Sequence, residues 1–115
     1  MKINIIPVLK RAKQLLIKKG WGQKCFAKFG NGQPCWDPTD TRACNFCLSG
    51  VLAAASKSLD KNEAIILNRE LRKTIGLGIG EWISSWNDDI SRTKEEVIKA
   101  IDDTIARLYK KKTKY

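Results

Sequence analysis

The chain has 115 residues, enough for one folded domain with one hydrophobic core and too few for two. Its composition, 43% hydrophobic and 30% charged with a formal net charge of +10, is that of a soluble globular protein that attracts anions. No apolar run approaches the ~20 residues of a membrane span and no secretory signal pattern is present, so we expect a cytoplasmic protein with reduced thiols and no membrane contact.

The first predicted element is a helix over residues 5–19, where apolar residues recur at helical spacing between basic ones. Pro7 fits its first turn, which needs no backbone N–H donor, and Gly20 ends it. The residues of its apolar face are Ile5, Leu9, Ala12, Leu15 and Leu16. We expect this face to be buried and the lysines to remain in solvent.

Glycine and proline mark residues 20–41 as a long irregular loop, a kind of segment that is often functional in compact domains. Within it, a short extended pair is predicted around residues 26–29 and 34–36, joined by a tight turn at Asn31 and Gly32. We expect the apolar side chains of the loop to hold it against the helices. They belong to Trp21, Phe26, Phe29 and Trp36.

Three more helices and one short helical piece follow. The expected ranges are 41–57 for the second helix, about 60–74 for the third, 81–86 for the short piece after a glycine-rich break, and 93–110 for the last helix. The second is apolar nearly all round and should be central. The predicted fold is therefore all-α: a single compact domain over residues 1–115, a bundle of four main helices plus one short helix, with frayed ends at 1–4 and 110–115.

Basic residues are concentrated at the two ends of the chain. The first 36 residues contain eight basic residues and no acid, and lysine outnumbers arginine sixteen to six, which argues against base-specific readout of DNA. If the termini lie close together, one patch results, either for binding nucleic acid, a nucleotide or an acidic protein or simply as solvated charge. The predicted patch is Lys10, Arg11, Lys13, Lys18, Lys19, Lys110, Lys111 and Lys112.

The four cysteines, Cys25, Cys35, Cys44 and Cys47, are enough for a zinc site. Only Cys44 and Cys47 have a standard ligand spacing, and they fall inside the second predicted helix, where both sulfurs would lie on its apolar stripe. Core packing is the favoured interpretation, so we predict no cofactor, with zinc as the alternative. Cys25 and Cys35 flank the predicted turn, but a disulfide between them would need an oxidising compartment.

The chemistry of an enzyme is hard to assemble from this chain. It contains no histidine, the usual general base. Asp88 and Asp89 are adjacent, so their side chains diverge and do not form a carboxylate pair. The glycines at 76, 78 and 80 lack the Gly-Lys-Ser/Thr ending of a phosphate-binding loop. We therefore favour a protein that is not an enzyme.

The most distinctive stretch runs from residue 86 to residue 97. Asn87 and Asp88 suit a tight turn, and Thr93 with Glu96 fits a capping box at the start of the last helix. Trp82 and Trp86 share a helical face, as a core wall or a stacking platform. Arg92 lies beside a helix N-terminus, whose partial positive charge is unfavourable for a cation, so we expect a negative group to compensate it, either Asp88, Asp89 or a bound anion. The candidate ligand-binding residues are Trp21, Trp86, Asn87, Asp88 and Arg92.

These residues, with others, resemble a small uncharacterised helical domain of unknown function from bacteria and bacteriophages. The matching segments are Leu15-Leu16 with Gly20-Trp21, Gly32-Gln33-Pro34, Asp37-Pro38, Cys47-Leu48 with Gly50-Val51, and Trp86-Asn87-Asp88 with Arg92-Thr93 and Glu96-Val97. The resemblance implies one compact domain of bacterial or viral origin and no particular activity. Its signature positions are Trp21, Cys47, Asn87, Asp88, Arg92 and Thr93.

The leading expectation is a non-enzymatic small basic binding protein, encoded by a phage, that engages an anionic partner, either a host protein or a nucleotide. One alternative is a sequence-nonspecific nucleic-acid-binding protein that uses the basic patch. Another is a small enzyme with a polar site at Asn87, Asp88 and Arg92. The sequence does not fix the oligomeric state.

Overall fold

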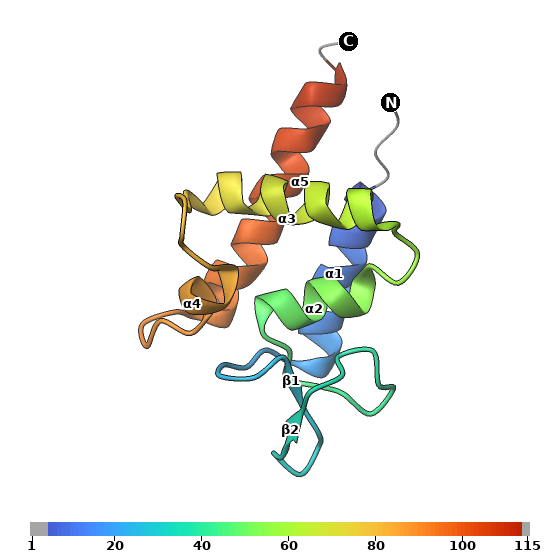
Figure 1. Cartoon of the computed structure of the whole chain (residues 1–115), viewed down its shortest axis with the longest axis vertical. Helices are drawn as coiled ribbons and strands as arrows, with labels where there is room; N and C mark the ends of the chain where they lie inside the picture. The colour runs from blue at the N-terminus through green and yellow to red at the C-terminus, as the bar shows by residue number, and fades with distance from the viewer. Residues whose placement is uncertain (1–4, 114–115) are drawn as a thin grey trace.

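The computed structural model describes residues 5–113, with side chains described as far as Lys110 (Figure 1). The elements in chain order are α1 (Ile6–Lys19), β1 (Ala27–Lys28), β2 (Pro34–Cys35), α2 (Leu48–Ala55), α3 (Lys61–Ile75), α4 (Ile83–Asn87) and α5 (Lys94–Thr113). The all-α prediction is thus correct only in a coarser form, because the chain is mostly helical but its long loop contains a small antiparallel sheet.

One hydrophobic core joins the helices. α1 packs against α2 and α5, α3 packs against α5, and α4 packs against α2. In Figure 1 the β1–β2 ribbon projects at the end of the molecule opposite the last turns of α5. Among the fully buried side chains, Leu9 and Leu16 come from α1, Phe46 from the loop, and Leu52 and Leu71 from α2 and α3. No helix in the described part of the chain is long and apolar enough to cross a bilayer.

Three helix ends that local sequence signals predicted are confirmed, the end of α1 and the starts of α3 and α5, whereas α5 continues to Thr113, past residue 110 where fraying was predicted. α1 has Pro7 in its first turn and ends at Gly20, whose φ of 96° is one that L side chains rarely adopt. Asp60 caps α3 in a complete capping box, with reciprocal hydrogen bonds to residue 63. Thr93 and Glu96 cap α5 in the same way, through backbone-to-side-chain bonds of 3.0 and 3.2 Å.

The second helix is much shorter than its apolar pattern predicted, because it begins only at Leu48 instead of near residue 41. Cys44 exchanges two backbone hydrogen bonds of 2.7 Å with Lys28 of β1. Phe46 forms an isolated parallel bridge with the loop after α1. These long-range pairs occupy the backbone groups that an extra helical turn would need, so tertiary structure overrides the local preference.

A buried ion pair fastens α3 to α5. Glu70 on α3 is only 4% exposed, and Arg107 on α5 donates from Nη1 to its carboxylate at 3.0 Å. The Nη2 group of Arg107 donates to the Glu70 carbonyl at 2.6 Å and to the Thr74 hydroxyl at 3.2 Å. Lys73 lies 3.4 Å from the second carboxylate oxygen. A carboxylate this deeply buried depends on these cationic partners.

We predict that Arg107→Ala lowers the free energy of unfolding by about 2 kcal/mol, because it leaves the Glu70 carboxylate buried with Lys73 as a weaker partner. The value lies below that for fully buried pairs because the Arg107 side chain is 31% exposed. Urea denaturation followed by circular dichroism measures the change. The matched control is Lys99→Ala, which breaks an exposed pair with Asp103 and should change stability by less than about 0.5 kcal/mol. Equal losses of stability in the two variants would contradict the stabilising role of the ion pair between Glu70 and Arg107.

Candidate functional site

Asn87, the last residue of α4, is fully buried and bonded at both ends of its amide. Its Oδ1 accepts hydrogen bonds from Trp21 Nε1 at 2.7 Å and from the Leu48 backbone N–H at 3.0 Å. Its Nδ2 donates to the Gly22 carbonyl and to Asp88 Oδ1, both at 3.1 Å. One side chain thus joins the loop after α1, the start of α2 and the end of α4.

Asp88 and its neighbours clamp the next part of that loop. Asp88 Oδ1 accepts the backbone N–H of Lys24 at 2.9 Å, and Lys24 has a φ of 76°, a left-handed conformation uncommon outside glycine. Gln23 Nε2 donates to the carbonyls of Asn87 and Asp89, at 2.9 and 2.8 Å. Residues 23 and 24 are therefore held against the turn between α4 and α5 in a conformation that the loop alone would not favour.

Arg92 is engaged within the protein, but its ion-pair partner is not one of the two expected aspartates. Its Nη1 pairs with Glu96 at 3.1 Å, and its Nε donates to the Trp86 carbonyl at 2.9 Å. The guanidinium carbon lies 3.8 Å from the centre of the Trp86 ring, a cation–π contact. Of the five predicted ligand-binding residues, three meet at Asn87, while Trp86 and Arg92 form this separate pair.

Two of the basic residues predicted on the first helix contact α5. Lys10 donates to the Tyr109 hydroxyl at 2.8 Å, and Lys13 forms an ion pair with Asp102 at 3.0 Å, so both face α5. The Lys10 contact brings the start of α1 beside the end of α5, which is where the predicted lysine patch was to form. These two charges are partly satisfied within the protein.

The other predicted patch residues differ in how they are engaged. Arg11 and Lys19 donate to the backbone carbonyls of residues 55 and 41, at 3.2 and 3.0 Å. Lys18 is exposed and makes no side-chain hydrogen bond or ion pair with any other described residue. Lys110 is also exposed, and the side chains of Lys111 and Lys112 lie outside the described residues.

The cysteines do not form a common site, and all four are free thiols. No group of three or more possible ligands lies close enough to hold a metal ion within residues 5–110. Cys44 and Cys47 do not share a helical stripe as predicted, because only Cys47 reaches α2, where its Sγ caps the helix by accepting the Gly50 N–H at 3.2 Å. Burial raises the pKa of the Cys47 thiol, which therefore stays protonated at neutral pH.

The β1–β2 ribbon has a buried side and an exposed side. Ala27 pairs with Cys35, and both are buried. Side chains alternate along a strand, so the next pair in this register, Phe26 and Trp36, lies on the outer side, where these residues are 45% and 68% exposed. Lys28 lies two residues from Phe26 on the same side and is half-buried. We call the outer residues Phe26, Lys28, Pro34 and Trp36 the ribbon face.

A shallow pocket of about 200 Å³ opens beside the ribbon face and is lined by Phe26 and Trp36. The remaining lining residues are Lys24, Cys25, Cys47, Ser84 and Asp88. Small-molecule sites usually measure ~300–1,000 Å³, so this pocket suits one ring or one side chain of a larger partner.

The expectation that Phe26 and Trp36 hold the loop to the helices is wrong, since of the four apolar loop residues only Trp21 and Phe29 pack on the core. The small residues Ala27 and Cys35 were a sequence signal that one side of the ribbon is buried, and this signal was overlooked.

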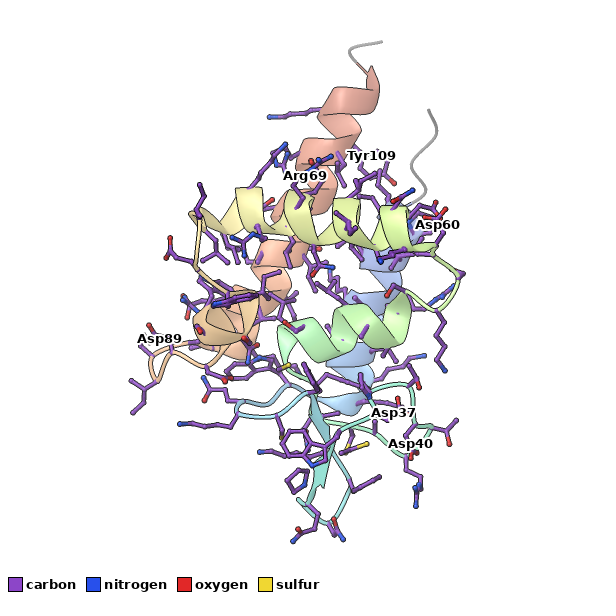
Figure 2. The ribbon with its side chains drawn as sticks, in the orientation of Figure 1. Asp37, Asp40, Asp60, Arg69, Asp89 and Tyr109 are labelled. Atoms are coloured by element: carbon purple, nitrogen blue, oxygen red, sulfur yellow. The ribbon has the colours of Figure 1, made fainter. Side chains whose placement is uncertain are left out.

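Three aspartates stabilise turns, two in the loop after β2 and one after α4. Arg42 lies 2.9 Å from the carboxylate of Asp40 and lowers its pKa to about 2. Hydrogen bonds from Thr39 lower the pKa of Asp37, and hydrogen bonds from the serine two residues on lower the pKa of Asp89. Figure 2 shows Asp37 and Asp40 on the loop after β2 and Asp89 on the turn after α4.

A family model described as a family of unknown function, DUF6197, matches residues 3–107 of the chain. The chain belongs to this family. The DUF6197 match covers every segment on which the resemblance was based and confirms it, while bacterial or viral origin stays a prediction. No curated protein and no solved structure matches the chain. The description of DUF6197 names no activity, so membership of the family assigns none to this chain.

We predict that Asn87→Ala lowers the free energy of unfolding by about 3 kcal/mol or more, because Trp21 Nε1 and the Leu48 N–H lose their acceptor inside the protein. Urea denaturation measures the loss. The matched control is Asn68→Ala on α3, an exposed asparagine whose one side-chain bond is to the Ala64 carbonyl, with an expected change within about 0.5 kcal/mol. A loss no larger than that of the control would show that the Asn87 amide is dispensable.

Acid should destabilise the protein through Asp37, Asp40 and Asp89. Their pKa values are lower in the folded state than the ordinary 3.8, so their stabilising effect is complete above about pH 4 and is lost as the pH falls toward 2. Thermal unfolding measured over this range should show Tm decreasing with pH. Asp40→Asn should make the decrease shallower, whereas Glu95→Gln, which removes an exposed carboxylate, should not. The same slope in wild type and Asp40→Asn would refute the role of Asp40.

Proposed function

We propose that this protein is a small non-enzymatic binding protein that contacts an anionic partner through its ribbon face and the adjacent pocket. The observation that carries the proposal is the pair of large aromatic side chains, Phe26 and Trp36, left in solvent at the mouth of a pocket. Both come from a ribbon whose inner side is well buried. Exposed aromatic residues around a hollow are typical of recognition surfaces.

The polar residues of the family signature are hydrogen-bonded within the protein, which favours a binding protein over an enzyme. Asn87 uses both ends of its amide on internal partners, and Arg92 is bonded to Trp86 and Glu96. A catalytic group needs to point at a reacting atom instead. The thiol of Cys47 lines the pocket, but its raised pKa keeps it in the weakly nucleophilic protonated form.

The charge of the chain supports an anionic partner. The net charge is +10, and the first carboxylate is Asp37. Lys18 and Lys28 make no side-chain hydrogen bond or ion pair with the rest of the described chain, so their charges are available to a partner. Such unpaired lysines raise the local concentration of anions and speed their association.

Fluorescence anisotropy with three labelled polyanions, a short oligothymidine, a DNA duplex and an oligoglutamate, tests this proposal at about 50 mM salt. At least one probe should bind, and Trp36→Ala should weaken that binding about tenfold, because a ring contact is lost. The matched control is Trp82→Ala, since Trp82 is also 68% exposed but does not line the pocket; its binding should change less than about twofold. Absence of binding to every probe, or equal losses in the two variants, would overturn the proposal.

A further inference from the structure

We infer that the anionic partner is single-stranded nucleic acid, with one unpaired base stacked on the ribbon face and the adjoining phosphates on nearby lysines. The inference rests on the proposed function and names its partner class. It starts from the shape of the site. Phe26 directly precedes β1 and Trp36 directly follows β2, and the pocket that both line has room for about one ring. Every base has a flat π face, so stacking on an aromatic side chain is possible for any base.

The charges around the pocket separate the base from the phosphates. Asp88 lines the pocket, and its carboxylate disfavours entry of a phosphate but not of an uncharged base. Lys24 lines the rim of the same pocket, and Lys28 lies on the ribbon face. Lys18 stands near the end of α1, from which the chain leads directly into the loop. This arrangement puts the base inside and the backbone outside.

The arginines favour nucleic acid over an acidic peptide. Arginine is the usual residue for paired hydrogen bonds to carboxylates, because its planar fork matches their geometry. Five of the six arginines already donate to protein groups: Arg11, Arg42, Arg72, Arg92 and Arg107. The sixth, Arg69, lies on α3, far from the ribbon (Figure 2). Lysines carry the remaining positive charge at the site, which suits phosphates and predicts binding with little sequence preference.

The stacking surface also favours an unpaired strand over a duplex. Bases in a duplex are stacked on each other, and their faces cannot reach a protein side chain unless the helix opens. The ribbon face is held in place before binding, because Asp88 fixes Lys24 and Cys47 donates its backbone N–H to the Phe26 carbonyl at 3.1 Å. A preformed aromatic surface reduces the ordering that binding requires.

The test compares labelled oligothymidine, a duplex of the same length and oligoglutamate by fluorescence anisotropy at about 50 and 200 mM salt. Oligothymidine should bind at least about tenfold more tightly than the other two probes, and Phe26→Ala and Trp36→Ala should each weaken it about tenfold. Trp36→Phe, which keeps a ring, should restore most of the affinity, and Trp82→Ala should leave it unchanged. Lys28→Gln should reduce the slope of log K against log salt by about the amount that one phosphate contact contributes.

The outcomes distinguish the inference from the proposal beneath it. If oligoglutamate binds and requires Trp36 while oligothymidine does not bind, the partner is an acidic protein; the inference fails and the proposed function stands. If the duplex binds as tightly as the single strand and Trp36→Ala has no effect, binding is a general property of positive charge, and both the inference and the proposed function fail. If no probe binds, both are overturned. Circular dichroism of each variant confirms that the fold is retained.

Discussion

The buried amide of Asn87 is the constraint on which the rest of the structure depends. A polar group inside a protein must find hydrogen-bond partners, and this one is satisfied only where a tryptophan, a helix start, a loop carbonyl and an aspartate meet. An aspartate could not donate to the Gly22 carbonyl, and a leucine could bond to none of the four groups. The arrangement therefore selects an amide and, through it, a single way of placing the loop against α2 and α4.

This placement supports a ribbon that would be unstable alone, because β1 and β2 contain only two residues each. Cys44 bonds to the second residue of β1, and the Cys47 N–H bonds to the Phe26 carbonyl. Gly50 lets the first turn of α2 approach that carbonyl, which would clash with any added Cβ. The start of α2 and the inner side of the ribbon are thus one packed unit, and its consequence is that Phe26 and Trp36 remain outside.

Local signals in the sequence were sufficient for α1, α3 and α5, because their ends are fixed by residues within one turn, such as Gly20, Asp60 and Thr93. They were insufficient for α2, whose start is set by bonds between Cys44 and Lys28, sixteen residues apart in the chain. The exposure of Trp36 was missed for the same reason. Hydropathy favours burying a tryptophan, and only the pairing of Ala27 with Cys35 determines which side of the ribbon faces water.

The short segments that carry the resemblance to the family and the residues proposed to bind a partner are largely different. Asn87 and Arg92 direct their polar atoms to other parts of the chain, so they stabilise the fold, and neither side chain lines the pocket beside the ribbon. Phe26, Lys28 and Trp36 are absent from the matching segments, yet they form most of the surface beside it. A chain could keep the signature and the fold while changing these three side chains. In this chain the signature residues Cys47 and Asp88 line the pocket, whereas the exposed aromatic side chains at its mouth lie outside the signature.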